Sequence, residues 1–324
     1  MLNFWKSIFG QTIQPKPEHT TSERPEPITQ RVLMIVHDPR FPDQGNRQMH
    51  KLFNWQDPEQ LARRYAQDVH EVSHGYANYE LVEQISVDTF PIKLSGFRYT
   101  ADEYWNCRQG HSSFYQPDAV DYHAIMQKHQ VFERIASGEI DEIWLFGFPY
   151  AGYYESIMAG PRSIFCNAPP LLNSDQAQRR FVIMGFSYER GVGEMLENLG
   201  HRAESILSHV YQREPESTNY WEQFTRYDQK NPGRAACGNV HFAPNSVKDY
   251  DWGNSTKVYS TCDDWLNFPN LTGDGRMVNS QDWGRGDTRA HHKWWFERFP
   301  AVVGETNGIS HNWWEYVLDP NKVR

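Results

Sequence analysis

Two carboxylates follow apolar runs that have the composition of buried strands, and such positions can carry acid/base chemistry. Glu155 comes after the run EIDEIWLFGFP, and Glu189 is the second residue after the run RRFVIMGFS. Open α/β sheets bind ligands at the carboxyl ends of their strands. A carboxylate pair there suits glycosidic hydrolysis, in which one acid protonates the leaving oxygen and the other attacks or activates water. We therefore predict Glu155 and Glu189 as catalytic residues, with Tyr188 and Arg190 shaping the charge of Glu189.

A structural role for the same acids remains open at this point. Glu155 could cap a short helix, and Glu189 could pair with Arg190 or another nearby cation. The deciding observation is whether the two carboxylates converge in one aromatic-lined pocket or lie on separate faces.

A second polar group lies on a predicted helix over residues 192–210. Glu197 and His201 are four residues apart and Glu204 follows three residues later, so the three share one side of the helix. Glutamate and histidine are ligands that zinc accepts. If a divalent metal binds, we expect His201 with Glu197 or Glu204 to hold it, together with at least one histidine from the last third of the chain: His241, His291, His292 or His311.

The same polar face also fits a solvated or docking surface. At 100° per residue, the apolar side chains of the helix form one broad stripe, made of Val192, Met195, Leu196, Leu199, Ala203, Ile206 and Leu207. Opposite this stripe lies a polar arc made of Glu194, Glu197, His201, Glu204 and Ser205. Glu194, in the first turn of the helix, complements the helix dipole. The pattern predicts the helix but leaves the role of its polar side open.

Tryptophan is concentrated in the last third of the chain. Eight of the twelve tryptophans follow residue 215, in a segment rich in Asn, Asp, Gly and Pro. Each ring buries on the order of 150 to 250 Å², so we predict that this segment wraps the rest of the protein. It could also line a binding cleft, for which the candidate substrate-binding residues are Trp294, Trp313, His241, Asn245 and His311.

Strand-like runs alternate with helix-like segments between residues 31 and 215. The predicted strands cover 31–39, 79–91, 139–149, 162–166 and 179–187, and the predicted helices cover 57–75, 121–138 and 192–210. This alternation is typical of an α/β fold with a doubly wound, mostly parallel sheet and helices on both faces. We expect three parts: a disordered polar, Pro-rich segment at 1–30, an α/β core at 31–215, and an irregular Trp-rich extension at 216–324 packed on that core.

Composition limits the function classes. The net charge of −9 argues against nucleic acid as a partner, because phosphate binding needs a basic surface. No apolar run approaches the roughly 20 residues of a membrane span. The four cysteines have no CxxC spacing, which favours reduced thiols in the cytoplasm. No glycine-rich phosphate loop indicates a nucleotide cofactor.

These observations favour a hydrolase that acts on a glycan or another polar small molecule through carboxylate acid/base chemistry. Two alternatives stay open. One is a metal-dependent hydrolase that uses His201 with Glu197 or Glu204. The other is a non-catalytic carbohydrate-binding or protein-interaction module, which would use the aromatic residues without needing paired acids.

Overall fold

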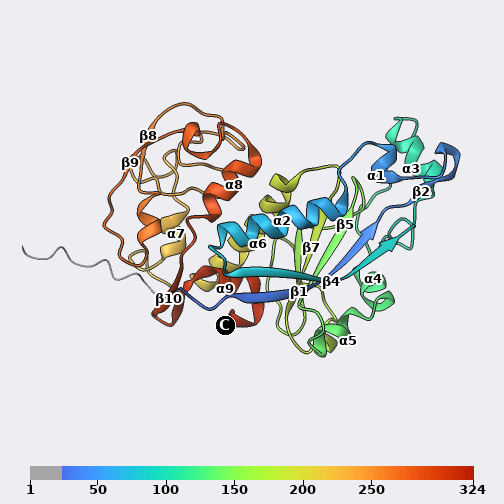
Figure 1. Cartoon of the computed structure of the whole chain (residues 1–324), viewed down its shortest axis with the longest axis horizontal. Coiled ribbons are helices and arrows are strands. Elements are labelled where there is room, and N and C mark those ends of the chain that lie inside the picture. The colour runs from blue at the N-terminus through green and yellow to red at the C-terminus, as the bar shows by residue number, and fades with distance from the viewer. Residues whose placement is uncertain (1–23) are drawn as a thin grey trace, which may run out of the picture.

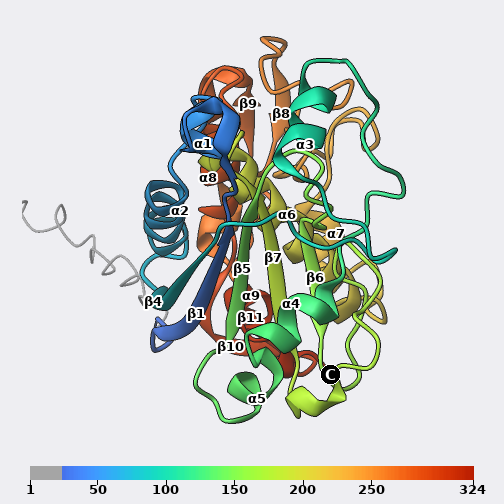
Figure 2. The same cartoon turned by 90° about the vertical axis from the view of Figure 1, so that its right-hand side faces the viewer.

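The apolar runs predicted as strands form the central sheet of the protein. In the computed structural model, which describes residues 24–324, five strands lie side by side in the order β4-β1-β5-β7-β6 (Figures 1 and 2). Their bounds are β1 (Ile28–His37), β4 (Ala77–Val87), β5 (Glu142–Gly147), β6 (Ser156–Ala159) and β7 (Phe181–Ser187). β6 pairs antiparallel with β7, and the other pairings are parallel. The prediction of a mostly parallel sheet in a mixed α/β fold is confirmed.

Helices and short hairpins complete the described part of the chain. The helices are α1 (Met49–Leu52), α2 (Pro58–Val72), α3 (Ala101–Arg108), α4 (Tyr122–Lys128), α5 (Val131–Ala136), α6 (Val192–Val210), α7 (Tyr220–Phe224), α8 (Thr288–Phe296) and α9 (Trp313–Leu318). The hairpin strands are β2 (Arg40–Phe41), β3 (Arg47–Gln48), β8 (Val258–Ser260), β9 (Arg276–Val278), β10 (Ala301–Thr306) and β11 (Ile309–Asn312). α6, which carries the polar arc, has the bounds that its periodicity predicts.

Two predicted elements are wrong, and backbone geometry explains both. The run at 162–166 forms a loop, because left-handed backbone at Arg162 (φ 56°) and Asn167 (φ 52°) stands at its two ends. The predicted helix over 121–138 is split into α4 and α5, because Gln130 also adopts a left-handed conformation (φ 52°).

The predicted disordered segment at 1–30 falls mostly on residues outside the described part of the chain. Within the described part, β1 begins at Ile28, so its last three residues are strand.

The Trp-rich last third shares a hydrophobic core with the rest of the protein. All eight of its tryptophans are buried, and they join one cluster with residues of the central sheet, α2 and α6. α8 packs against α6 and α2, and α9 packs against α6, as the neighbouring positions in Figure 1 show. This segment contains α7, α8, α9 and two hairpins, so it is more regular than its composition indicates.

A chain ending at residue 215 is expected to aggregate rather than melt cooperatively. The truncation removes the tryptophans that share a core with α2 and α6. It therefore exposes the apolar side chains that these tryptophans cover, and large exposed apolar patches promote association. Size-exclusion chromatography and thermal melting of the truncated chain check this. A monomeric truncation with one cooperative transition would show that residues 31–215 fold independently.

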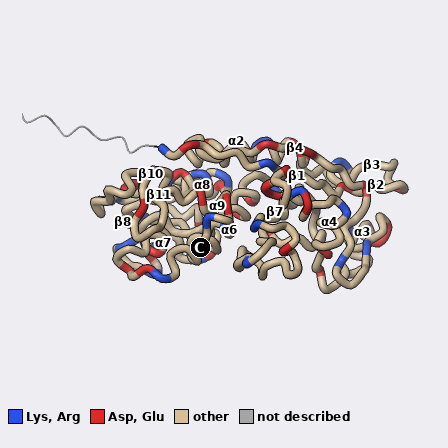
Figure 3. The backbone as a smooth tube through the Cα atoms, turned by 90° about the horizontal axis from the view of Figure 1, so that it is seen from below, with Lys and Arg blue, Asp and Glu red and all other residues tan. Residues whose placement is uncertain are grey.

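Charged residues of both signs are spread over the described part of the chain. Lys/Arg and Asp/Glu positions are interspersed along the backbone (Figure 3). Among residues 24–324, no helix combines the length and apolar character needed to cross a membrane.

Candidate functional site

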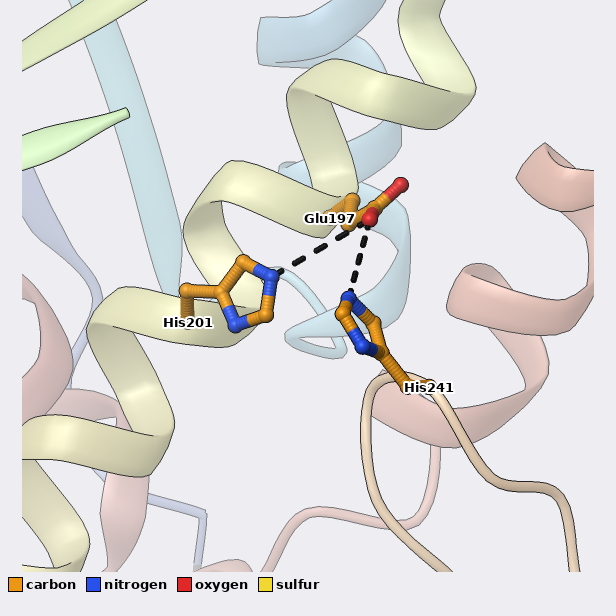
Figure 4. A group of neighbouring side chains, drawn as sticks. All are labelled: Glu197, His201 and His241. Carbon is orange, nitrogen blue, oxygen red and sulfur yellow. Dashed lines mark hydrogen bonds and ion pairs between the residues drawn. The ribbon is translucent and has the colours of Figure 1, made fainter. Parts of the chain in front are cut away.

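The polar arc of α6 meets a loop from the last third of the chain. Glu197 and His201 project from α6, and His241 reaches them from the loop that follows α7 (Figure 4). One potential ligand atom from each of these residues lies within 4.8 Å of the others. Glu197 Oε1 is 3.1 Å from His241 Nε2 and 4.0 Å from His201 Nε2. Two ligand atoms on a tetrahedral zinc ion are about 3.4 Å apart, so this spacing suits a metal ion after small side-chain adjustments.

A glycine allows the loop to come this close to α6. A Cβ atom at Gly200 would lie 2.5 Å from Val240 Cγ2, so a larger residue there would push the loop away. The backbone N–H of Val240 donates to Glu204 Oε1 at 3.1 Å, and Val240 O lies 3.2 Å from His292 Nε2. These contacts fix the position of His241, the next residue along the chain.

Carboxylates orient both histidines of the group. His201 Nδ1 lies 3.2 Å from Glu204 Oε2, and His241 Nδ1 lies 3.0 Å from Asp249 Oδ1. Each ring therefore directs its Nε2 atom toward Glu197. Metal-binding histidines usually have such a partner on the other ring nitrogen, which fixes the tautomer and raises the basicity of the ligand. Glu204, predicted as an alternative ligand, thus lies behind His201 and positions it.

The site concentrates opposite charges in a half-buried place. Burial raises the pKa of Glu197, but its hydrogen bonds with His241 and Tyr250 outweigh this, so the pKa lies below its ordinary value. The hydrogen bond to Glu197 raises the pKa of His241. Burial lowers the pKa of His201, but the hydrogen bond and charge of Glu204 outweigh it and raise the pKa. Hydrogen bonds and opposite charges therefore hold the group together.

The two predicted catalytic acids line one pocket at the carboxyl ends of β5 and β7. This pocket has a volume of about 340 Å³, and Glu155, Glu189 and Arg190 are among its lining residues. Its aromatic lining residues are Phe148, Tyr150, Tyr153, Tyr154 and Phe186. Both acids thus belong to one aromatic-lined pocket, an arrangement that favours the catalytic interpretation. Glu189 also lies 3.9 Å from Arg108, so a neighbouring cation accompanies it as the structural interpretation anticipates.

Glu155 lies between this pocket and the group formed by Glu197, His201 and His241. Its Oε2 atom lies 3.7 Å from His201 Nε2 and accepts a hydrogen bond from Asn167 Nδ2 at 2.6 Å. Glu155 follows β5 and precedes β6, and it does not cap a helix. One carboxylate therefore faces both the pocket and the histidine that α6 presents.

Tyr188 takes a different direction from the other predicted catalytic residues. It is fully buried, and its hydroxyl donates to the backbone oxygen of His37 at 3.1 Å. It is not among the residues that line the pocket. The structure thus places Tyr188 in the hydrophobic core, where its hydroxyl links the end of β7 to the end of β1.

Of the five predicted substrate-binding residues, only His241 reaches the site. The other four are buried and do not line the pocket. Trp313 donates from Nε1 to the Tyr211 hydroxyl, and Trp294 packs against the Arg298 guanidinium. Asn245 donates to backbone oxygens of its own loop, and His311 Nε2 lies 2.7 Å from Thr306 Oγ1.

Asp249, Tyr250 and Asn167 are site residues that the sequence did not indicate. They lie in loops without hydrophobic periodicity, so no local pattern places them beside α6. Comparison of the chain with protein-family models, with curated proteins and with solved structures found no match. The arrangement of these side chains is therefore the basis for assigning a function.

Proposed function

We propose that the protein is a divalent-metal-dependent hydrolase of a polar substrate, with Glu197, His201 and His241 as the metal ligands. The observation that carries this proposal is the orientation of the two histidines. Each has Nδ1 beside a carboxylate and Nε2 facing Glu197. Two histidines and one glutamate are the ligands of one class of catalytic zinc sites, which keep a further position open. A divalent cation bound there would supply Lewis-acid chemistry and acidify water.

Glu155 is the residue best placed to move a proton in this reaction. It lies beside His201 and also lines the pocket, so it can contact both water at the metal site and a substrate. A carboxylate in that position acts as a general base toward the attacking water and as a general acid toward the leaving group. Asn167 holds one of its oxygens and thereby limits its rotation.

The pocket supports a polar substrate such as a glycan. It combines aromatic rings with acidic groups and with Arg190. Aromatic side chains can stack on sugar rings, and the charged groups can hydrogen-bond to hydroxyls.

We also propose that the fold is doubly wound, with helices on both faces of the central sheet. The support for this is that alternate residues of β1 join two hydrophobic clusters, one with α2 and α6 and the other with α4 and α5.

A metal-free carboxylate mechanism is the second candidate function. Glu155 and Glu189 line the same pocket, and two carboxylates flanking a scissile bond are sufficient for glycoside hydrolysis. Chelation separates the two mechanisms, since only the first loses activity when divalent ions are removed. Binding of glycans without turnover would instead favour the carbohydrate-binding module.

Calorimetric titration of the full chain with zinc tests the proposed site. We expect one zinc ion per chain, and we expect His241→Ala to abolish this binding because it removes one of the three ligands. Glu204→Gln is expected to weaken binding by about 10- to 100-fold, the usual effect of removing the partner of a ligating histidine.

His209→Ala is the matched control, since His209 lies on α6 two turns beyond His201. It should bind zinc like the unaltered chain. The proposal fails if the unaltered chain binds neither zinc nor manganese and if neither these ions nor a chelator changes its melting temperature.

A further inference from the structure

Tyr250 lies against the same atoms that form the proposed metal site. Its hydroxyl donates a hydrogen bond to Glu197 Oε1 at 2.9 Å and lies 3.1 Å from His241 Nε2. The phenol oxygen is thus within hydrogen-bonding distance of two of the three proposed ligand atoms. A metal ion bound between those atoms would have the phenol oxygen as an immediate neighbour.

We infer that Tyr250 is a fourth, displaceable ligand of the metal, an inference that rests on the proposed function. On coordination, the O–H bond of the phenol breaks, its proton passes to solvent water, and the phenolate oxygen forms the bond to the metal. Side chains that bind metals release protons in this way. The resulting set of two histidines, one glutamate and one tyrosine fills the position that a substrate needs.

Adjacent residues hold the two edges of the same imidazole. Asp249 lies at Nδ1 of His241, and Tyr250 lies near Nε2. The backbone N–H of Tyr250 also donates to the oxygen of His241 at 3.2 Å, which closes a short loop between them. Asp249 and Tyr250 are adjacent on this loop, so the loop conformation that places the Asp249 carboxylate beside His241 also places the Tyr250 phenol there.

The environment of Tyr250 allows its side chain to leave the metal. The residue is 51% exposed, whereas Glu197 is 6% exposed. The tyrosine ring packs against His241 and the edge of Trp252, with ring centroids 4.5 and 5.2 Å away, and its other side faces solvent. A substrate entering beside Glu155 can therefore displace the phenolate, which takes up a proton from solvent water and then donates a hydrogen bond to the substrate.

Copper(II) is a spectroscopic probe for this ligand. With one equivalent of copper, the full chain is expected to develop the visible charge-transfer band of a copper–phenolate bond. Tyr250→Phe should still bind copper stoichiometrically but lack this band, because the ring remains while the oxygen is removed. Tyr259→Phe is the control, since Tyr259 is an exposed tyrosine on β8, and it should keep the band.

Each outcome of this experiment decides the inference. Stoichiometric copper binding without the band in the unaltered chain overturns Tyr250 as a ligand while leaving the proposed metal site intact. A band that persists in Tyr250→Phe overturns it as well. Copper binding that survives His241→Ala refutes the proposed site itself and the inference with it.

Discussion

Replacing Glu155 by glutamine is expected to lower kcat/KM by about 10²- to 10⁴-fold, the usual contribution of a general acid or base. Glutamine keeps the shape of the side chain and can still accept the hydrogen bond from Asn167, but it cannot take a proton. The melting temperature and the affinity for zinc should stay close to those of the unaltered chain. Rates on a panel of glycosides, esters, phosphoesters and peptides provide the measurement.

Glu189→Gln identifies which mechanism operates. In the metal-dependent mechanism, the loss of Glu189 should cost less than the loss of Glu155, because Glu189 pairs with Arg108 whereas Glu155 lies beside His201. In the carboxylate-pair mechanism, both substitutions should be severe and a chelator should have no effect. If both variants stay within about threefold of the unaltered rate, then neither carboxylate contributes materially to transition-state stabilisation, and the catalytic interpretation of this pocket is wrong.

Arg202→Met is expected to lower the free energy of unfolding by about 3 to 5 kcal/mol, the usual cost of leaving one partner of a buried ion pair alone. Arg202 on α6 and Glu142 on β5 are both buried, and Arg202 Nη1 donates to Glu142 Oε2 at 2.7 Å. The other carboxylate oxygen accepts from Trp144 Nε1 at 2.8 Å. Without the arginine, the carboxylate must stay charged and unpaired or become protonated. Urea unfolding provides the measurement.

Two further variants show whether the unpaired charge is the cause. Adding Glu142→Gln to Arg202→Met removes that charge and should recover part of the lost stability. Arg63→Met is the control, because the pair of Arg63 with Glu59 is exposed on α2, and exposed pairs contribute about 0 to 1 kcal/mol. Equal losses in Arg202→Met and in the double variant would show that the cost comes from lost packing.

Local patterns were sufficient to predict four of the five strands of the central sheet and the helices α2 and α6. The apolar stripe of α6 predicts its bounds, and Asp57 followed by proline predicts the start of α2, where its side chain accepts from Glu59 N and Gln60 N. These signals act within one or two turns, so the sequence contains them directly. The left-handed conformations of Gln130, Arg162 and Asn167 were missed, because left-handed backbone at non-glycine residues depends on how the flanking segments pack.

The residues of the candidate site could likewise be predicted only in part from the sequence. The sequence by itself determined that Glu197 and His201 share one face of α6, because a spacing of four residues fixes that relation in any helix. It offered four histidines as partners and could not select among them. The tertiary structure brings His241 to this face, because Gly200 leaves room for Val240, the residue that precedes it. It also brought Asp249, Tyr250 and Glu155 to the same place, since contacts between residues far apart in the chain follow from the packing of whole elements and leave no periodic trace in the sequence.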